Sequence, residues 1–318
     1  MPTNVLLLRS PSEDGGPDKY EDAFRARGYH ALSVPVLETV HENLDELAQV
    51  VQRGGSLPDM SAGASARYAG VIITSARACE AWRTVVQQLV EQGVGNAAPS
   101  RGWDTVPFYV VGSATASALC AIEAAFPESP YTPRDIRGGS ESGTAEKLAH
   151  YIVSDVPQSG SRRLLYLTGD KNRDTLPRIL GDGGLELESL QVYATQGSSR
   201  FEDDLRQALG EVSQYLSRLT DGANAVTSAD RGETWWIVHF APSAAKAVSP
   251  TLAQYFQIPG AEATESRARR NARVAAIGPT TSEFLRDQLH IEVAVVAGRP
   301  TPEALSEGIA AWDRECES

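Results

Sequence analysis

Short runs of Val, Ile and Leu recur along the chain, and most are followed by a turn and an amphipathic segment. Because these runs are nearly continuous rather than alternating with polar residues, they are typical of strands buried on both faces, as in parallel sheets covered by helices. The pattern therefore predicts an α/β fold. Strands are expected at about residues 4–9, 32–37, 69–74, 107–112, 163–168, 187–194, 235–240, 273–278 and 291–297. Helices are expected at residues 76–91, 113–125, 143–154 and 280–288.

The length of 318 residues favours two domains, since a domain usually has about 100–200 residues. Residues 31–38 and 187–194 resemble each other, and each is an extended run that suits a chain leaving one sheet and entering another. If both are crossovers, residues 37–193 form an α/β domain inserted into a discontinuous one made of residues 1–36 and 194–318. The expected fold is two parallel-sheet domains joined by a two-stranded β linker, a hinge that leaves a cleft between them.

Three stretches look like surface insertions, at residues 53–66, 217–234 and 260–271. They are rich in Gly, Ala, Ser or charged residues and show no hydrophobic periodicity. Mobile loops are the expected state of such segments, and we assign them no function.

The composition of the chain argues against several classes of binding partner. The net charge of −12 argues against a nucleic-acid partner, which normally requires a basic face. No apolar run reaches the ~18–20 residues of a membrane helix, and the N-terminus lacks the basic start of a secretory signal. The three cysteines, Cys79, Cys120 and Cys316, are widely spaced, and the first two are expected as reduced, buried thiols in helices. The cytoplasm is the expected compartment, with no membrane partner.

Turns rich in Gly, Ser and Thr follow several expected strands, at residues 74–77, 112–115, 168–170, 241–243 and 278–281. Ligands of open parallel sheets bind outside the carboxyl ends of the strands, where helix N-termini offer N–H groups to anions. Ser and Thr are also the favoured N-caps of any helix, so each turn alone is better explained as a cap than as a site. Together the turns predict donors for an anionic small molecule.

Standard cofactor and catalytic motifs are missing from the sequence: GxxxxGK[ST], GxGxxG after the first strand, HExxH and GxSxG. The five histidines are isolated, and His239 lies in an apolar strand, where a packed side chain is expected rather than a catalytic one. We therefore expect no metal and no nucleotide cofactor. An enzyme of this kind would hold and shape its substrate more than attack it.

Eight segments carry a resemblance to a known family: VLLLRS (5–10), TSARACEAW (74–82), YVVGSATASAL (109–119), SGTAEKLAHYI (142–152), LESLQVYAT (187–195), HFAPSA (239–244), AAIGPTTSEFL (275–285) and RPTPEAL (299–305). In this order they resemble the uroporphyrinogen-III synthases, over nearly the whole chain except the three insertions. The insertions resemble those of eukaryotic members, fungal ones included. The resemblance implies two α/β domains on a two-stranded linker, no cofactor and a monomer.

The implied substrate is the linear tetrapyrrole hydroxymethylbilane, and the implied product is uroporphyrinogen III. The reaction loses the terminal hydroxyl, forms an electrophilic azafulvene and closes through a spiro intermediate that inverts ring D. Each pyrrole ring carries an acetate and a propionate, so the ligand is a polyanion. Because released substrate cyclises without inversion, the main task of such an enzyme is to control the conformation of the bilane.

The resemblance also suggests roles for individual residues. Tyr193 is the candidate for assisting departure of the hydroxyl, although it is equally explained as an aromatic that packs the linker strand. The candidates for holding carboxylates are Ser75, Thr115, Ser243, Thr280 and Thr281, with the backbone around Gly112 and Gly169. Arg77 and Arg273 match basic positions of the family, but a surface role or packing of the aliphatic stem fits each as well. Ala241 stands where many members have serine, which weakens the assignment of Ser243.

Two other functions remain as alternatives. One is a non-catalytic two-domain protein that closes on an anionic metabolite, whose usual exported forms carry a signal sequence. The other is a two-domain glycosyl transferase, which needs a sugar-nucleotide site and a catalytic carboxylate or histidine.

Overall fold

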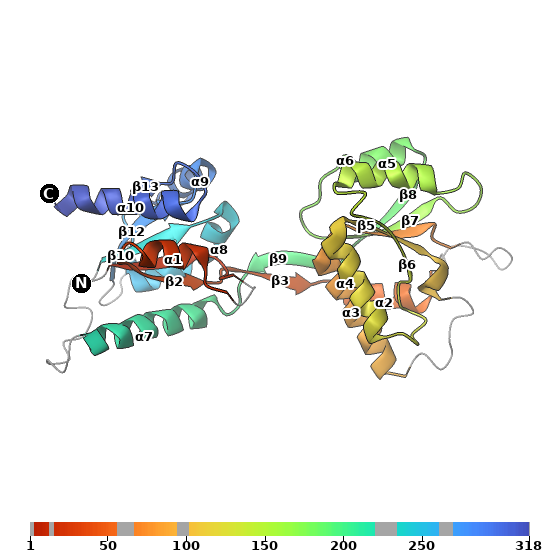
Figure 1. Cartoon of the computed structure of the whole chain (residues 1–318), viewed down its shortest axis with the longest axis horizontal. Coiled ribbons are helices and arrows are strands. Elements are labelled where there is room, and N and C mark those ends of the chain that lie inside the picture. The colour runs from red at the N-terminus through yellow and green to blue at the C-terminus, as the bar shows by residue number, and fades with distance from the viewer. Residues whose placement is uncertain are drawn as a thin grey trace. The chain divides into compact units, whose positions relative to one another are not determined.

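The computed structural model describes residues 3–12, 16–55, 67–93, 102–219, 234–260 and 270–317. The chain forms two compact units, shown in Figure 1. Unit 1 consists of Met1–Glu38 and Gln196–Ser318, and unit 2 of Thr39–Thr195. Both boundaries, after residues 38 and 195, fall two residues beyond the expected positions, after 36 and 193.

Unit 1 contains a parallel sheet in which β1 is flanked by β2 and β10. The strand order is β11 (Phe256–Gln257), β12 (Arg270–Ala276), β10 (Thr234–His239), β1 (Asn4–Leu8) and β2 (His30–Val34), with β13 (Val295–Val296) also paired to β12. The apolar runs form the central strands, and Val5 to Leu8 are fully buried. Burial on both faces explains why these strands do not alternate with polar residues.

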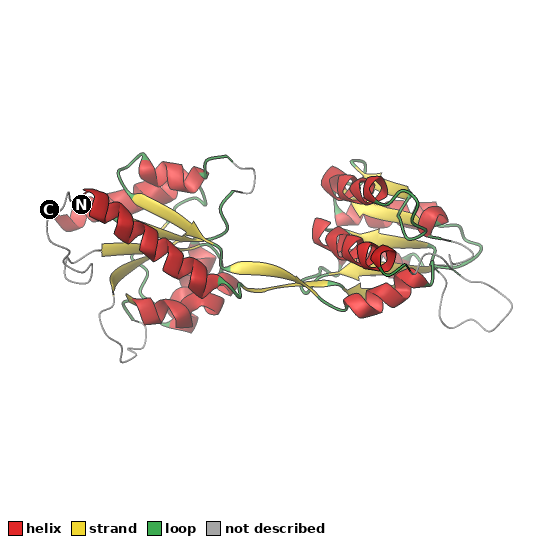
Figure 2. Ribbon diagram, turned by 90° about the horizontal axis from the view of Figure 1, so that it is seen from below, coloured by secondary structure: helices red, strands yellow, loops and turns green. Residues whose placement is uncertain are grey.

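Helices cover both faces of the unit 1 sheet (Figure 2). On one face, Leu6, Leu8 and Ile237 share a core with α7 (Phe201–Leu219), α8 (Pro242–Tyr255) and α9 (Pro279–Leu289). On the other face, Leu7 and Trp236 share a core with α1 (Lys19–Arg25) and α10 (Pro302–Glu317). The sheet is therefore doubly wound.

Unit 2 repeats this architecture. Its parallel sheet has the order β6 (Asp135–Gly139), β5 (Pro107–Val111), β4 (Gly70–Ile73), β7 (Arg163–Thr168) and β8 (Glu186–Gln191). One face packs on α2 (Leu44–Gln52), α3 (Ala76–Glu91) and α4 (Gly112–Ala125), and the other on α5 (Ala145–Asp155) and α6 (Thr175–Asp182). A one-turn helix, η2 (Trp103–Thr105), places Trp103 in the first of these cores.

The two-stranded linker is present as expected. It consists of β3 (Leu37–His41) and β9 (Tyr193–Gly197), which pair with each other and include both passages of the chain between the units. Backbone hydrogen bonds flank the pair, from Glu42 N to Val192 O and from Ser198 N to Val36 O, both 3.0 Å. The partners run in opposite directions along the chain, so the strands are antiparallel.

Several sequence expectations need correction. The single strand expected at 187–194 is two strands, β8 and β9, because the chain passes from one sheet to the linker at Val192. The strand expected at 291–297 shrinks to the two residues of β13, and the expectation overlooked β6. Cys79 is buried as expected, whereas Cys120 is exposed. No helix in the described part of the chain is long and apolar enough to cross a membrane.

The three expected insertions lie mostly outside the described residues. At their edges the loop expectation was wrong: residues 217–219 are the end of α7, and Thr234, Arg270 and Asn271 belong to strands β10 and β12. These strands begin before the apolar runs, since pairing with neighbouring strands extends them into polar sequence.

Candidate functional site

Each sheet has a point at which the winding direction changes. In unit 2, helices α3 and α4 cover one face and α5 and α6 the other, so the change falls between β4 and β7. In unit 1, α1 and α8 lie on opposite faces, so the change falls between β1 and β10. Ligands of doubly wound sheets bind outside the carboxyl ends of the strands at this point. The carboxyl edge of each sheet is therefore the expected location of a ligand.

In unit 2, Ser75 and Gly169 follow the two strands that flank the change of direction. Their strands are paired with Ile73 opposite Leu167. The Ser75 hydroxyl oxygen accepts a hydrogen bond of 3.2 Å from the backbone N–H of Arg77 and so caps α3. The cap explanation is correct for Ser75, and the hydroxyl proton remains as a donor at this edge.

The next strand, β5, leads into α4 without a capping side chain. Gly112 opens the helix with φ of +77°, a conformation that side-chain-bearing residues rarely adopt, and no side chain accepts from the first-turn N–H groups. Thr115 lies one turn into α4 and is only 5% exposed, and its carbonyl lies 3.7 Å from the Cys79 sulfur. Burial raises the pKa of Cys79 to about 12. Thr115 thus packs between helices, and the backbone at Gly112 is the accessible donor.

Tyr193 lies against the carboxyl edge of the unit 2 sheet. It is half-buried at the start of β9, with its ring close to Gly169. The guanidinium carbon of Arg77 is 5.9 Å from the centre of the ring, and Arg77 Nη1 lies 3.5 Å from Thr195 Oγ1. The backbone N–H of Thr195 donates to Asp170 at 3.3 Å. The fold therefore brings Tyr193, Gly169 and Arg77 together; sequence reasoning missed Thr195 and Asp170.

In unit 1, the expected Ser and Thr residues lie in the first turns of α8 and α9. Ser243 and Thr280 are exposed, whereas Thr281 is only 4% exposed. The N-cap positions are Ala241 and Gly278, and neither helix has a side-chain cap. These hydroxyl residues are therefore not caps.

The difference in capping separates two kinds of helix start. Asp18, Ser75 and Thr144 cap α1, α3 and α5 through their side chains. Helices α4, α8 and α9 begin at the carboxyl edges without any side-chain acceptor. The first N–H groups of a helix have no intrahelical partner, and with the helix dipole they attract anions. Each sheet edge thus offers donors suited to carboxylates.

Arg273 is not placed at the carboxyl edge. It lies three residues before the end of β12, and its guanidinium donates to Asp313 on α10 at 2.9 Å. The guanidinium carbon also lies 4.3 Å from the centre of the Trp312 ring. The Asp313 carboxylate accepts from Trp236 and Tyr29 as well. Arg273 therefore attaches α10 to the sheet, which agrees with the packing alternative, and the substrate-binding role implied by the resemblance stays a prediction.

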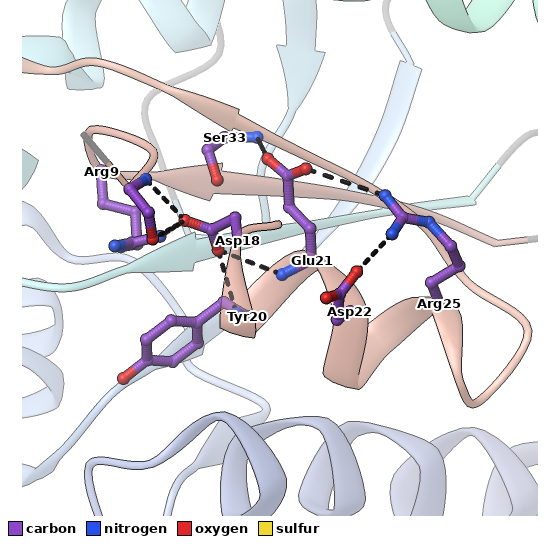
Figure 3. Close-up of polar contacts among 8 residues, drawn as sticks. Arg9, Asp18, Tyr20, Glu21, Asp22, Arg25 and Ser33 are labelled. Atoms are coloured by element: carbon purple, nitrogen blue, oxygen red, sulfur yellow. Dashed lines mark hydrogen bonds and ion pairs between the residues drawn. The ribbon is translucent and has the colours of Figure 1, made fainter. Parts of the chain in front are cut away.

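Arg9 directly follows β1 at the change of winding direction, and sequence reasoning did not select it as a site residue. Its Nη1 donates to Asp18 at 2.6 Å (Figure 3). Burial would raise the pKa of Asp18, but hydrogen bonds from Arg9 and from the backbone of Glu21 and Tyr20 outweigh it and lower the pKa. The Arg9 side chain is 24% exposed and its partner only 5%. The only signal for it in the sequence was its position after the first apolar run.

His239 ends β10 and is packed in the core, as expected. It lies opposite Leu8 and Ala276 and is 1% exposed, and neither ring nitrogen has a hydrogen-bond partner among the residues that the structure describes. Burial lowers its pKa to about 4, so the ring is neutral at neutral pH. Among the described residues, no group of three or more His, Cys, Asp or Glu side chains is placed to hold a metal ion.

Comparison with known proteins gives concordant matches. The model of a family described as uroporphyrinogen-III synthase HemD matches residues 18–307. The uroporphyrinogen-III synthase of Saccharomyces cerevisiae is 26% identical over 316 residues, 98% of this chain and 96% of that protein. That of Schizosaccharomyces pombe is 27% identical over 314 residues, 98% of each.

Solved structures of the same name also match over almost the full length. Uroporphyrinogen-III synthetase from Helicobacter pylori has a TM-score of 0.41 and 13% identity, covering 98% of this chain and 99% of that one. A mutant uroporphyrinogen III synthase from Thermus thermophilus has a TM-score of 0.38 and 15% identity, with the same coverage.

Proposed function

The chain belongs to the uroporphyrinogen-III synthase family, and we propose that it cyclises hydroxymethylbilane to uroporphyrinogen III. The terminal hydroxyl leaves the bilane and an electrophilic azafulvene forms. Ring closure through a spiro intermediate inverts ring D, and the net change is the loss of one water molecule. The enzyme is a lyase of tetrapyrrole biosynthesis that needs no cofactor.

The observation that carries the proposal is the set of uncapped helix starts at the carboxyl edges of the two sheets. Helices α4, α8 and α9 leave their first N–H groups without a side-chain acceptor. Ser243 and Thr280 add exposed hydroxyls in two of these first turns. The bilane carries an acetate and a propionate on each ring, and such donors match carboxylates. The net charge of −12 makes local donors necessary, because the global field repels a polyanion.

The other candidate substrate-binding residues differ in how exposed their donor groups are. Ser75 donates its hydroxyl proton, and Gly112 and Gly169 let a carboxylate approach the backbone closely. Arg77 supplies a cation beside them, with an exposed side chain. Thr115 and Thr281 are buried, so we assign them the support of their helix starts rather than contact with a carboxylate.

Tyr193 is the residue that we propose for the chemical step. Its phenol can donate a hydrogen bond to the departing hydroxyl oxygen, which makes that oxygen a better leaving group. The ring is held by Gly169 on one side and by the core of unit 2, against which it packs. The Arg77 guanidinium lies beside the ring, 5.9 Å from its centre, in a cation–π contact.

We further propose that the protein acts in the cytoplasm as a monomer. All residues assigned to the reaction come from a single chain, so no second copy is needed to complete the set. Sedimentation of the purified chain at micromolar concentration tests this proposal, and a dimer at all concentrations would contradict it.

Incubation of the purified chain with freshly generated hydroxymethylbilane tests the activity. The product is oxidised to porphyrin, and its type I and type III isomers are separated by chromatography. We expect the type III isomer to dominate. A product that contains only the type I isomer, even with measurable binding of the bilane, would instead indicate the non-catalytic binding protein.

A further inference from the structure

We propose that Arg9 binds one carboxylate of the substrate at the carboxyl edge of the unit 1 sheet and that Asp18 is its positioning residue. This inference rests on the proposed function, since it takes the substrate to be a polycarboxylate. It adds a cationic contact to the carboxyl edge of the unit 1 sheet. Arg273, the unit 1 cation expected to bind substrate, is bound to Asp313 on α10 instead.

The position of Arg9 in the unit 1 sheet supports this role. Arg9 is the residue that follows β1, and its guanidinium carbon lies 5.7 Å from the centre of the Phe240 ring, which follows β10. The Arg9 side chain therefore spans the two strands between which the winding direction changes. In a doubly wound sheet this is the place where a crevice forms and ligands bind.

The Arg9 side chain is also held in place before any ligand arrives. Tyr20 and Phe240 pack edge to face with centres 5.0 Å apart, and the guanidinium lies over both rings. Figure 3 shows Arg9 directed at Asp18, whose carboxylate also accepts from Ser12 and from the backbone N–H groups of Tyr20 and Glu21. An arginine fixed in this way loses little conformational entropy when it binds an anion.

The number of N–H donors on the Arg9 guanidinium supports the same role. A guanidinium has five N–H donors, and within the described part of the chain Arg9 donates only through Nη1, to Asp18. The side chain is 24% exposed, so part of it is open to a ligand. A planar fork of this kind matches a carboxylate, which can accept two parallel hydrogen bonds.

The negative charge of Asp18 does not cancel this role. The Asp18 carboxylate receives hydrogen bonds from Ser12, Tyr20 and Glu21 in addition to Arg9, which spread its charge over several donors. Its side chain is only 5% exposed, so a substrate carboxylate would meet the guanidinium and not the aspartate. Asp18 thus orients Arg9 from behind.

The experiment compares Arg9→Gln, Arg9→Lys and Asp18→Asn with the unaltered chain. Arg25→Gln is the matched control, because Arg25 is 64% exposed on α1 and, among the described residues, forms ion pairs only within its own helix. For each protein, KM and kcat are measured with freshly generated hydroxymethylbilane, and the midpoint of thermal unfolding is recorded. Lysine keeps the charge but loses the fork, and asparagine keeps the N-cap of α1 but loses the charge.

We expect Arg9→Gln to raise KM on the order of tenfold while kcat changes much less, as for loss of a charge-assisted hydrogen bond in binding. Arg9→Lys and Asp18→Asn should raise KM by smaller factors, with a nearly unchanged unfolding midpoint for Arg9→Lys, and Arg25→Gln should leave KM unchanged. A lower unfolding midpoint with an unchanged KM in Arg9→Gln would reduce Arg9 to a structural tie and overturn the inference.

Two further outcomes are decisive. If Arg9→Gln does not fold, Arg9→Lys decides, and a KM equal to that of the unaltered chain contradicts the inference. If the unaltered chain forms no type III isomer, the proposed function fails, and the inference fails with it. That result is seen before any variant is compared, so the two failures are distinguished.

Discussion

The phenol ring of Tyr193 lies so close to Gly169 that a Cβ at residue 169 would come within 2.8 Å of the phenol oxygen and closer still to two ring carbons. Gly169 is the first residue after β7, and Tyr193 begins the linker strand β9. Only a residue without a side chain permits this contact. The position of the proposed catalytic phenol therefore depends on the glycine.

Gly169→Ala should move Tyr193 and slow the reaction. The added methyl group cannot be accommodated without displacing the ring, and we expect a loss of about 1–3 kcal/mol of stability, as in overpacked cores. The reaction rate should fall together with the stability. Gly181→Ala on α6 is the control, because nothing lies within 4 Å of a Cβ there. The control should be neutral or slightly stabilising, and equal losses in both variants would remove the contact from the explanation.

Tyr193→Phe should lower kcat with the fold intact. Removing only the hydroxyl leaves the ring packed on Gly169 and the core, while the departing hydroxyl loses its donor. We expect kcat to fall about 100-fold, the lower end of the range for proton-donor assistance, with little change in the unfolding midpoint. Tyr255→Phe is the control, since its hydroxyl contacts only Arg206 and Glu202 in the described structure. Unchanged kinetics in Tyr193→Phe would limit Tyr193 to packing.

Arg273→Gln should destabilise the protein without changing KM. It removes the ion pair with Asp313, whose side chain is 14% exposed, and the contact with Trp312. We expect a loss of about 1–3 kcal/mol in the free energy of unfolding, as when a largely buried charge loses its partner. Arg286→Gln, on the exposed surface of α9, should change stability by less than about 0.5 kcal/mol. A raised KM in Arg273→Gln would restore the substrate-binding role.

His239→Leu should make the protein less sensitive to acid. In the native state the pKa of His239 falls from 6.5 to about 4, so the unfolded chain takes up a proton that the folded one refuses. Stability is fully present above pH 6.5 and is lost as the pH falls towards 4. By linkage the loss at pH 4 is about 3 kcal/mol.

The leucine variant lacks this titration, so the difference in unfolding free energy between the two proteins should grow in its favour between pH 7 and pH 4. Chemical denaturation at several pH values measures it. Parallel pH profiles for His239→Leu and the unaltered chain would show that His239 titrates normally.

Local sequence was sufficient to predict the bounds of elements whose apolar residues are consecutive or strictly periodic. β7 and α3 have the bounds predicted from sequence, because a buried strand needs an unbroken apolar run and a helix needs a periodic one. The edge strand β6 was missed: it begins with Asp135 and ends with two glycines, and only its pairing with β5 makes it a strand. Strand pairing is a long-range property that a local pattern does not contain.

The Ser, Thr and Gly turns were located correctly from the sequence, because a helix that follows a buried strand must start with small or polar residues. Which of these residues cap their helix and which leave the N–H groups available depended on the tertiary structure. Ser75 caps α3, whereas Ser243 and Thr280 do not cap the helices they start. Both arrangements are compatible with the same residue types.

The sequence by itself determined two doubly wound α/β units, their linker and the turns at the strand ends, since these follow from hydrophobic periodicity over short distances. Only the tertiary structure decided the use of the arginines and of Tyr193. Arg273 pairs with Asp313 on α10. The Arg9 side chain reaches from the end of β1 to Phe240 after β10 and donates a hydrogen bond to Asp18. The Tyr193 ring packs against Gly169. Such contacts join residues far apart in the chain, and their geometry is set by how strands pair and helices pack.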